Sequence, residues 1–375
     1  MYQIDFQKPL HIHFIGIGGI SMSGLAEILM GEGFTVSGSD AKESPLTKSL
    51  EAKGAKIFYG QRASNIMDST EAVVYTAAIH PDNPEFAKAK EKNLPMLTRA
   101  QLLGQIMRNY DTPIAISGTH GKTTTTSMVS HILLEGKCDP TISVGGILPA
   151  IGGNIRVGES ETFVTEACEY TNSFLSFFPK ISIILNIDAD HLDFFKDLDD
   201  IRHSFRRFAE LLPSDGTLII NADIPDYQEI TKELPCRVVT YGLEQEADYQ
   251  AKDITFDKYG HASFTVYKNG RKTGSYYLRV PGMHNVSNAL ASIALGHLLG
   301  LTEEVIIKGL GSFTGTDRRF QYKGEVAGVT VIDDYAHHPT EIEATLHAAG
   351  NYPHQKIWCV FQPHTYTRTK ALLPE

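Results

Sequence analysis

Hydrophobic residues in this chain gather in short, uninterrupted runs that end in glycine or polar residues. Such runs occupy residues 11–15, 34–38, 72–76 and 94–97 in the first third, and residues 114–116, 163–165, 181–185 and 218–220 farther along. Runs without polar alternation are typical of strands covered on both faces, as in parallel sheets. After the first run, Met22, Leu25, Ile28 and Leu29 recur at helical spacing, which predicts a helix between two strands.

The pattern changes twice toward the C-terminus. Between about residues 248 and 280, apolar and polar residues alternate, which predicts a small antiparallel insertion, and a helix follows Gly282. Apolar runs at residues 329–332 and 357–361 predict two strands of a third unit. We therefore predict an α/β fold with three parts: a Rossmann-like N-terminal domain (residues 1–110), a central P-loop-type α/β domain with the antiparallel insertion (residues 111–312) and a partial C-terminal α/β domain (residues 313–375).

The composition narrows the class of protein. Of 375 residues, 42% are hydrophobic and 21% are charged, as in globular proteins, and no apolar run reaches the length of a membrane span. The first residues lack the basic and apolar segments of a signal peptide, and the four cysteines form no CxxC pair. The net charge of −10 argues against nucleic-acid binding, which needs a basic surface. We expect a cytoplasmic protein without membrane insertion.

The strongest chemical signal is a glycine turn between a predicted strand and a predicted helix. It consists of Gly118, Thr119, His120, Gly121, Lys122, Thr123 and Thr124. The N–H groups of such a turn surround phosphate oxygens, and the helix N-terminus adds positive potential. Lys122 is suited to the β- and γ-phosphates of a nucleotide, and the Thr123 hydroxyl to Mg²⁺. The common spacing needs glycine at position 116, where this chain has Ile116.

An earlier glycine turn is a weaker signal. It reads Gly16-x-Gly18-x-x-Ser21, so a serine replaces the third glycine of the dinucleotide fingerprint. Ser39 and Asp40 follow at the end of the next strand, where an acidic residue hydrogen-bonds a ribose in dinucleotide sites. Two ligands fit this pattern, a dinucleotide coenzyme and another diphosphate such as a UDP-sugar.

Acidic residues and a histidine follow two further predicted strands. Glu166 and Glu169 come after the run at 163–165, and His191 comes after the run at 181–185. Parallel strands bring their carboxyl ends to one edge, where the phosphate loop also lies. Carboxylates at that edge suit Mg²⁺, whereas imidazole is an unusual ligand for this ion. From the residues alone, His191 is therefore either a ligand or a structural histidine.

The remaining candidates lie in the second half of the chain. Asn285 and Asn288 are one helical turn apart, and a carboxamide can pair with the adenine edge, although helix capping by Asn285 fits equally well. Arg318 and Arg319 offer guanidinium groups to phosphate, although an exposed salt bridge is the more usual role of such residues. Two polar loops, at residues 333–339 and 362–368, follow the last two predicted strands, where ligand sites form in open α/β sheets.

Taken in order, these segments resemble the Mur ligases over essentially the whole chain. The first loop, GIGGISMS, is similar to the family's GIGGxGMS and departs at Ser21, and the second loop matches the family's GTHGKTTT, which accounts for Ile116. The family's EADES is present as EACEY, with both glutamates retained. His191 matches the histidine of the family's ADH, which is implicated in binding a second Mg²⁺. Asn285 and Asn288 match the HNxxN adenine contacts, and residues 333–339 resemble DDYxHHP.

Within the family, the chain is most similar to the members that attach L-alanine to UDP-N-acetylmuramate during peptidoglycan precursor synthesis. The resemblance implies that ATP converts the muramoyl carboxylate into an acyl phosphate, which the alanine amine then attacks. It implies ATP and Mg²⁺ as cofactors, and a role in cell-wall formation, cell shape and division. We expect a monomer or a homodimer.

The resemblance also distributes roles among residues. It implies catalytic roles for Lys122, Glu166 and His191, and metal binding by Thr123, Glu166, Glu169 and His191. ATP binding is expected from residues 118–124 with Asn285, Asn288, Arg319 and Asp334, in the central domain and the segment after it. UDP-sugar binding in the first domain is expected from Gly16, Gly18, Gly19, Ile20, Ser21, Ser39 and Asp40. The amino-acid side in the third domain is expected to include His337, His338, His364 and Arg368.

Several alternatives remain at this stage. A recycling ligase that attaches a peptide to UDP-N-acetylmuramate shares most of these motifs. A nicotinamide-dependent dehydrogenase would explain the first glycine turn and leave the second unexplained, and a UDP-sugar-binding fragment without catalysis would need only the first. The third domain, with two predicted strands, looks incomplete. We therefore expect this chain to bind its nucleotides without forming product, and to expose Val331, Ile357 and Val360.

Overall fold

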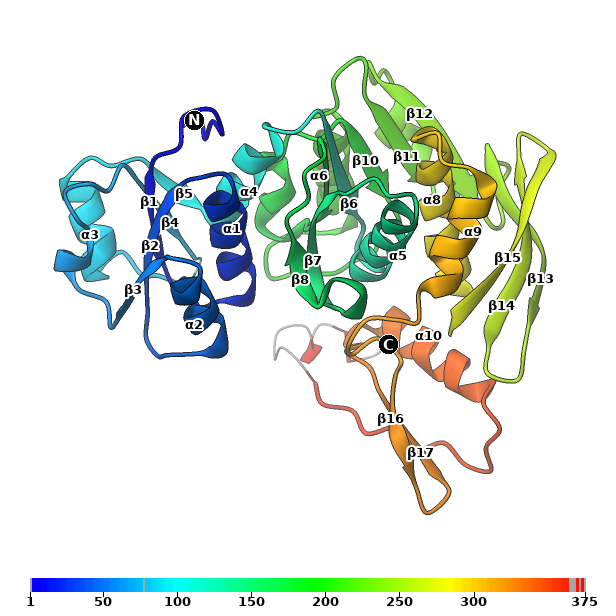
Figure 1. Cartoon of the computed structure of the whole chain (residues 1–375). Coiled ribbons are helices and arrows are strands. Elements are labelled where there is room, and N and C mark those ends of the chain that lie inside the picture. The colour runs from blue at the N-terminus through cyan, green and yellow to red at the C-terminus, as the bar shows by residue number, and fades with distance from the viewer. Residues whose placement is uncertain (1, 77, 364–368, 371, 374–375) are drawn as a thin grey trace.

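Three β-sheets follow one another along the chain, and each is associated with its own helices (Figure 1). The structure is a computed structural model that describes residues 2–76, 78–363, 369–370 and 372–373. It confirms the predicted α/β class, with a parallel N-terminal sheet, a large central sheet and a small antiparallel C-terminal sheet.

The first sheet has five parallel strands. In spatial order they are β3 (Lys56–Tyr59), β2 (Thr35–Asp40), β1 (His11–Ile15), β4 (Ala72–Tyr75) and β5 (Met96–Thr98). The helices around it are α1 (Ile20–Gly31), α2 (Pro45–Ala52), α3 (Pro84–Glu91) and α4 (Arg99–Met107), with a short 3₁₀ helix at Ala63–Asn65. Strand β1 is buried along its whole length, as its uninterrupted apolar pattern predicts.

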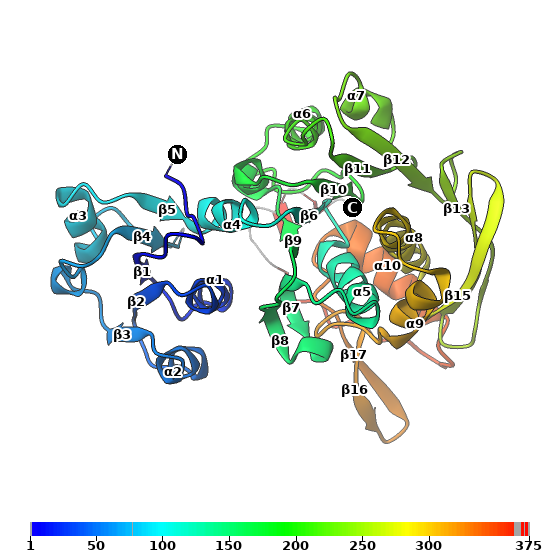
Figure 2. The same cartoon turned by 45° about the horizontal axis from the view of Figure 1, so that its top comes forward.

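Residues of β1 divide between the two faces of this sheet. Ile12 and Phe14 pack in the cluster that contains residues of α1 and α4, whereas Ile15 packs with Phe86 of α3. In Figure 2, α1 and α4 lie on the side of the sheet that faces the central part, and α3 lies on the far side. The first sheet therefore turns its α1–α4 face toward the rest of the protein.

The central sheet has ten strands. In spatial order they are β15 (Arg271–Pro281), β14 (His261–Lys268), β13 (Tyr249–Phe256), β12 (Arg237–Gly242), β11 (Thr217–Asn221), β10 (Ile181–Ile184), β6 (Thr112–Ser117), β9 (Thr162–Ala167), β7 (Thr141–Leu148) and β8 (Gly153–Arg156). The strands from β12 to β7 are parallel, and β13 to β15 form the predicted antiparallel insertion. The insertion extends the central sheet, because β13 pairs with β12.

Helices cover both faces of the central sheet (Figure 2). One face carries α5 (Lys122–Glu135), α8 (Met283–Leu298) and α9 (Glu303–Ser312), and the other carries α6 (Leu198–Ala209) and α7 (Tyr227–Thr231). Two 3₁₀ helices lie at Pro149–Ile151 and Tyr170–Ser176. Among the residues that the structure describes, no helix combines the length and the apolar character needed to cross a membrane.

The C-terminal part begins with an antiparallel hairpin. Strand β17 (Val329–Asp333) is the predicted strand, and it pairs with β16 (Gln321–Val326), which the sequence analysis did not predict. Helix α10 (Pro339–Gly350) follows and lies next to the central part (Figure 1). The prediction of a strand at residues 357–361 is wrong, since this segment has no strand partner in the structure. Val331, Ile357 and Val360 are exposed, as predicted.

Two glycines bring the first sheet's helices against the central part without room for a side chain. A Cβ atom at Gly24 of α1 would lie 2.1 Å from Cγ1 of Ile155 in β8. One at Gly104 of α4 would lie 1.9 Å from the backbone oxygen of Ser176. One hydrophobic cluster accordingly runs from the first sheet into the α6 face of the central sheet.

Gly104→Ala is expected to lower the free energy of unfolding by about 1–3 kcal/mol, because the new methyl group collides with a backbone atom. This loss outweighs the gain of roughly 1 kcal/mol that alanine brings to a helix interior. Gly311→Ala in α9 is the control, since its Cβ meets nothing within 4 Å. Urea denaturation measures both variants, and equal stability of the two would contradict the steric argument.

Candidate active site

The first glycine loop is tied to the end of β2. The backbone N–H groups of Gly16 and Ile17 donate to the carbonyl oxygen of Ser39 over 2.9 and 3.0 Å, and that of Gly18 donates to Oδ2 of Asp40 over 2.8 Å. Gly16 has a φ of +84°, which favours glycine. Gly19 caps the N-terminus of α1. The loop therefore stands at the carboxyl edge of the first sheet, and Asp40 holds it there.

Ile20 and Ser21, the next predicted contacts, open helix α1. Ile20 is exposed, although it is large and apolar. The hydroxyl oxygen of Ser21 accepts a hydrogen bond from Nη1 of Arg99 over 3.0 Å. The serine that departs from the glycine fingerprint thus connects the loop with the start of α4, and sequence analysis had not singled out Arg99.

Ser39 points away from this edge and into the protein. Its side chain is fully buried, and its hydroxyl donates to Oε2 of Glu85 in α3. Nε2 of His13 lies 3.5 Å from the same oxygen. Burial would raise the pKa of Glu85, but hydrogen bonds from His13, Ser39 and Asn65 outweigh it and lower the pKa. The hydroxyl of Ser39 is thus engaged inside the domain, away from the glycine loop.

The second glycine loop connects β6 to α5. Gly118 and Gly121 have φ values of +148° and +83°, so a side chain at either position would strain the backbone. The N–H of His120 donates to Oδ1 of Asn186 over 2.8 Å, and Nδ2 of Asn186 donates back to the His120 carbonyl oxygen over 3.1 Å. Oγ1 of Thr119 accepts the N–H of Asp188 over 2.9 Å. The loop is therefore fixed by the segment after β10.

Lys122 lies inside this loop and forms a buried ion pair. Its Nζ is 2.9 Å from Oε2 of Glu169 and also donates to the carbonyl oxygens of Gly118 and Thr119. Burial would lower the pKa of Lys122, but the Glu169 carboxylate more than offsets this effect and the pKa is raised. The ammonium group is therefore charged and is held by the carbonyl oxygens of the loop and by Glu169.

Two carboxylates and two further side chains form the candidate metal site. Oε2 of Glu166 accepts the Thr123 hydroxyl over 3.1 Å, and Oε1 of Glu169 lies 3.7 Å from Nε2 of His191. Burial raises the pKa of Glu166. Oε1 of Glu169 is buried without a hydrogen-bond partner, as a carboxylate oxygen that faces a cation would be. The fold thus brings Thr123 beside Glu166 and Glu169 beside His191, and metal binding by these residues stays a prediction.

The oxygen donors of Thr123, Glu166 and Glu169 are of the type that Mg²⁺ takes, rather than the sulfur and nitrogen donors of softer metals. In residues 2–76, 78–363, 369–370 and 372–373, His, Cys, Asp and Glu form no group of three or more arranged as metal ligands. Mg²⁺ typically takes one or two carboxylates and completes its shell with water and substrate phosphate oxygens. Glu166, Glu169 and the Thr123 hydroxyl fit that requirement.

His191 is held in an unusual conformation. Its φ is +55°, which is uncommon for a residue other than glycine. The ring of Tyr170 stacks on its imidazole with centroids 4.5 Å apart, and the Tyr170 hydroxyl donates to Oδ2 of Asp193 over 2.9 Å. Tyr170 stands where the EADES pattern has serine, so this chain orients His191 with an aromatic ring.

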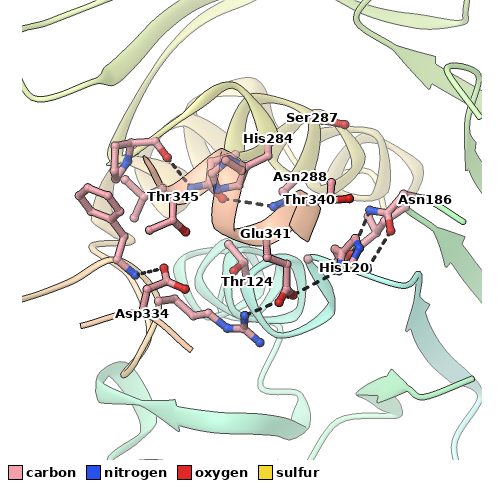
Figure 3. A pocket seen from close by; sticks show the side chains of 18 of the residues that line it. His120, Thr124, Asn186, His284, Ser287, Asn288, Asp334, Thr340, Glu341 and Thr345 are labelled. Atoms are coloured by element: carbon pink, nitrogen blue, oxygen red, sulfur yellow. Dashed lines mark hydrogen bonds and ion pairs between the residues drawn. The ribbon is translucent and has the colours of Figure 1, made fainter. Parts of the chain in front are cut away.

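A cavity of about 270 Å³ opens beside the second glycine loop (Figure 3). Its walls come from the glycine loop, from the end of β10, from α8, from the segment after α9 and from α10; they include His120, Gly121, Thr124, Asn186, Asn285, Asn288, Arg319, Asp334 and Glu341. The cavity therefore gathers most of the residues predicted to bind ATP. It lies at the carboxyl edge of the central sheet, where ligands bind in open α/β folds.

The two asparagines of α8 lie at the wall of this cavity. Nδ2 of Asn285 donates to the Pro281 carbonyl oxygen over 2.7 Å, and Nδ2 of Asn288 donates to Oδ1 of Asn285 over 3.2 Å. The alternative that Asn285 caps the helix is wrong, because Gly282 occupies the N-cap. A Cβ at Gly121 would lie 2.6 Å from Oδ1 of Asn288, so the glycine permits close packing of loop and helix.

The part of the chain between α9 and α10 contributes Arg319 and Asp334 to the site. Nη1 of Arg319 lies 3.8 Å from Oε1 of Glu341. Asp334 accepts the backbone N–H groups of Phe320 and Ala336 over 2.8 and 2.7 Å, and burial raises its pKa. Asp334 thus fixes the backbone beside Arg319, and both line the cavity.

The predicted amino-acid side is described in part. His338 is buried and caps α10, and Nε2 of His338 lies 3.2 Å from the carbonyl oxygen of Ala189. His337 lies beside it, with Nδ1 2.8 Å from the Tyr335 carbonyl oxygen. His364 and Arg368 lie outside the described residues. His338 therefore belongs to the contact between α10 and the central part, whereas His337 contacts Tyr335 and Glu341 within the C-terminal part.

Comparison with known proteins places these features in a family. Residues 11–111 match the model described as "Mur ligase family, catalytic domain", residues 116–296 match "Mur ligase middle domain" and residues 318–375 match "Mur ligase, glutamate ligase domain". A UDP-N-acetylmuramate–L-alanine ligase of Agathobacter rectalis is 64% identical over 373 residues, which cover 100% of this chain and 81% of the relative. The chain belongs to the Mur ligase family.

Solved Mur ligase structures share the fold. A UDP-N-acetylmuramate–alanine ligase from Thermotoga maritima superposes with a TM-score of 0.77 at 33% identity, covering 91% of this chain and 78% of that one. A murein peptide ligase from Psychrobacter arcticus gives a TM-score of 0.77 at 29% identity, covering 91% and 76%. Family membership argues against the dehydrogenase alternative, which left the second glycine loop unexplained.

Sequence analysis missed three side chains of this Mur ligase site. Asn186, Asp188 and Glu341 all contact the phosphate loop, yet no motif had singled them out. Asn186 and Asp188 directly follow β10, so their place at the carboxyl edge was a usable signal. Glu341 offered none, because its partner His120 is 221 residues away in the chain.

Asn186→Ala is expected to weaken ATP binding about tenfold and to lower the free energy of unfolding by about 1–3 kcal/mol. The reason is that the variant removes two hydrogen bonds to the backbone of His120. Isothermal titration calorimetry and urea denaturation measure the two effects. UDP-sugar binding serves as the internal control, since the first glycine loop does not touch Asn186, and a loss restricted to UDP-sugar binding would contradict the assignment.

Proposed function

We propose that the sites of this Mur ligase serve to join L-alanine to the carboxylate of UDP-N-acetylmuramate at the expense of ATP, in peptidoglycan precursor synthesis. The expectation that this chain binds its nucleotides without forming product stays a prediction. The observation that carries the proposal is the 64% identity, over the whole chain, to a relative named for that reaction. The geometry supports it independently, because the phosphate loop, a buried lysine and two carboxylates converge beside a cavity lined by the two α8 asparagines.

In the first step, a carboxylate oxygen of the sugar nucleotide attacks the γ-phosphorus of ATP, and ADP leaves. Lys122 is charged and placed in the phosphate loop, where it neutralises the transferring phosphoryl group. Asn285 and Asn288 orient the adenine, and Arg319 faces the same cavity. Mg²⁺, held by Thr123, Glu166 and Glu169 with His191 beside them, would neutralise further phosphate charge when bound. These residues position the reacting groups and stabilise the negative charge of the phosphoryl group being transferred. Catalysis of phosphoryl transfer consists mainly of these two effects.

In the second step, the alanine nitrogen attacks the acyl carbon, and phosphate leaves from the tetrahedral intermediate after the amine has lost a proton. The amino acid is expected to approach from the C-terminal part. His338, the N-cap residue of α10, stands on that side of the phosphate loop, and His337 precedes it. The same path would admit a peptide in a recycling ligase, so the entering amine is the point at which the two family activities differ.

Each of the three parts of the chain is proposed to bind one substrate. We assign UDP-N-acetylmuramate to residues 1–110, ATP to residues 111–312 and the amino acid to the part from residue 313 onward. Gly16, Gly18, Gly19, Ile20, Ser21 and Asp40 are the proposed contacts of the sugar nucleotide, because they stand at the exposed carboxyl edge of the first sheet. Ser39 would act there through its backbone carbonyl, which holds the loop. We propose a cytoplasmic monomer or homodimer.

Lys122→Ala is expected to abolish ATP binding, with a loss of at least about a hundredfold, because the variant removes the ammonium group proposed to contact the β- and γ-phosphates. It also leaves Glu169 buried without its partner, which costs about 3–5 kcal/mol of stability. Calorimetry at a temperature well below unfolding separates the two effects. Lys308→Ala, on the exposed surface of α9, is the matched control. Unchanged ATP affinity in Lys122→Ala would refute the phosphate-loop assignment.

UDP-N-acetylmuramate is expected to raise the melting temperature by several degrees, whereas NADH is expected to leave it unchanged. A ligand stabilises only the state that binds it, by about 2.7 kcal/mol at a concentration of 100 times its Kd. Differential scanning fluorimetry with each compound gives the answer. Stabilisation by NADH alone would favour the dehydrogenase, and stabilisation by UDP-N-acetylmuramate without any effect of ATP would favour a sugar-nucleotide-binding protein without catalysis.

A further inference from the structure

The imidazole of His120 lies between two carboxylates. Its Nδ1 is 3.2 Å from Oε1 of Glu341, and its Nε2 is 3.2 Å from Oδ2 of Asp188. Nδ1 is hydrogen-bonded to Glu341, whereas Nε2 faces Asp188 at ion-pair distance and is buried without a hydrogen-bond partner, so a ring with a proton on each nitrogen matches a carboxylate on each side. Burial would favour the neutral ring, but the two carboxylates raise the pKa of His120 to about 9. His120 is therefore an imidazolium at neutral pH.

Glu341 reaches this ring from the first turn of α10. Its Oε1 also lies 3.8 Å from Nη1 of Arg319, and its Oε2 accepts the backbone N–H of His337 over 3.2 Å. Only 14% of the side chain is exposed. Burial would raise the pKa of Glu341, but His120 and Arg319 hold it well below its usual range. The carboxylate is thus charged, largely shielded from water and bonded mainly to cations.

The backbone of His120 is also held by hydrogen bonds. Asn186 bonds both its N–H and its carbonyl oxygen. The ring of His338 packs against that of His120 with centroids 4.8 Å apart. The tautomer of His338 follows from its partners, since Nδ1 accepts the N–H of Thr340 while Nε2 donates to the Ala189 carbonyl oxygen. The start of α10 is therefore docked on the phosphate loop through matched polar contacts.

We propose that Glu341 is a positioning residue for the phosphate loop: by holding the imidazolium of His120 from α10, it keeps the loop in the conformation that binds the triphosphate of ATP. This inference rests on the proposed ATP site. It makes the ATP affinity of the central part depend on the docking of α10, which also supplies a wall of the cavity. Figure 3 shows the carboxylate of Glu341 directed at the ring of His120, with a dashed line joining the two.

Because Glu341 is charged, the direction in which its substitution changes the ATP affinity tests the proposal. A carboxylate beside a triphosphate repels it, so loss of the negative charge would by itself strengthen ATP binding. Loss of the positioning contact would instead weaken ATP binding, because the loop would sample conformations that do not bind. The two accounts of Glu341 therefore predict opposite changes for the same substitution.

The decisive experiment is calorimetric titration of ATP into the 375-residue chain and its variants at neutral pH. Glu341→Gln is expected to weaken binding by about ten- to a hundredfold, the range for a hydrogen bond between charged groups. Glu343→Gln removes the same charge from an exposed position two residues on and is expected to bind like the parent. Unchanged or tighter binding by Glu341→Gln overturns the proposal. Failure of the parent chain to bind ATP would instead reject the proposed function.

A double-mutant cycle tests whether Glu341 acts through His120. In a His120→Gln background, Glu341→Gln is expected to have little further effect, whereas an equal loss in both backgrounds overturns the proposal. Glu341→Asp, which keeps the charge and withdraws it by one methylene, is expected to be intermediate. If melting curves show that Glu341→Gln does not fold, Glu341→Asp takes its place in the cycle.

The pH dependence supplies a signature that a purely structural contact would lack. Because the pKa of His120 is raised, the advantage of the parent over Glu341→Gln is present below about pH 9 and is lost as the pH rises through that value. The other charged or titratable groups that face the pair are common to both proteins; they are Asp188, His284, Arg319, Asp334, His337 and His338. A ratio of affinities that stays constant up to pH 10 would contradict the role of the imidazolium.

Discussion

Parallel strands of one sheet all end at the same edge, and the candidate site depends on that constraint. Ser117 at the end of β6 pairs with Ala167 in β9 on one side and with Ile184 in β10 on the other. The segments that follow these three strands carry Lys122, Glu169 and His191, so they meet without any long-range signal in the sequence. The Lys122–Glu169 ion pair is then formed in a buried place, where it needs close geometry to offset the cost of desolvation.

Those parts of the site that are local in the chain could be predicted. A strand, a glycine turn and a helix fall within a few residues, so both glycine loops were visible in the sequence, and the register of the sheet does the rest. Asn285 marks the limit of such reasoning. Its residue type is typical of a helix cap, but Gly282, with a φ of +98°, ends the preceding strand and takes that position. The asparagine is thereby left for the cavity wall.

What escaped prediction was decided by tertiary packing. Ser39 stands at the correct end of β2, yet α3 places a buried carboxylate on its face of the sheet, and its hydroxyl turns inward. Residues 357–361 have the composition of a strand, but an extended segment becomes a strand only beside a partner that accepts its hydrogen bonds. No motif in the sequence marks Glu341 as a site residue. It matters because α10 sets it against a histidine from a loop in another part of the molecule.

The two glycine contacts between the first sheet and the central part have a wider consequence. At Gly24 and Gly104 the helices of the first sheet approach the central part so closely that a side chain at either position would push the two parts away from this arrangement. The separation between the two glycine loops is consequently a property of the folded chain, present before any ligand arrives. Under the proposed assignment, that separation limits the length of a substrate that can reach both loops. A sugar nucleotide anchored at the first loop can present its carboxylate to the second only if its own length matches the gap, so recognition of the substrate would include a measurement of its size.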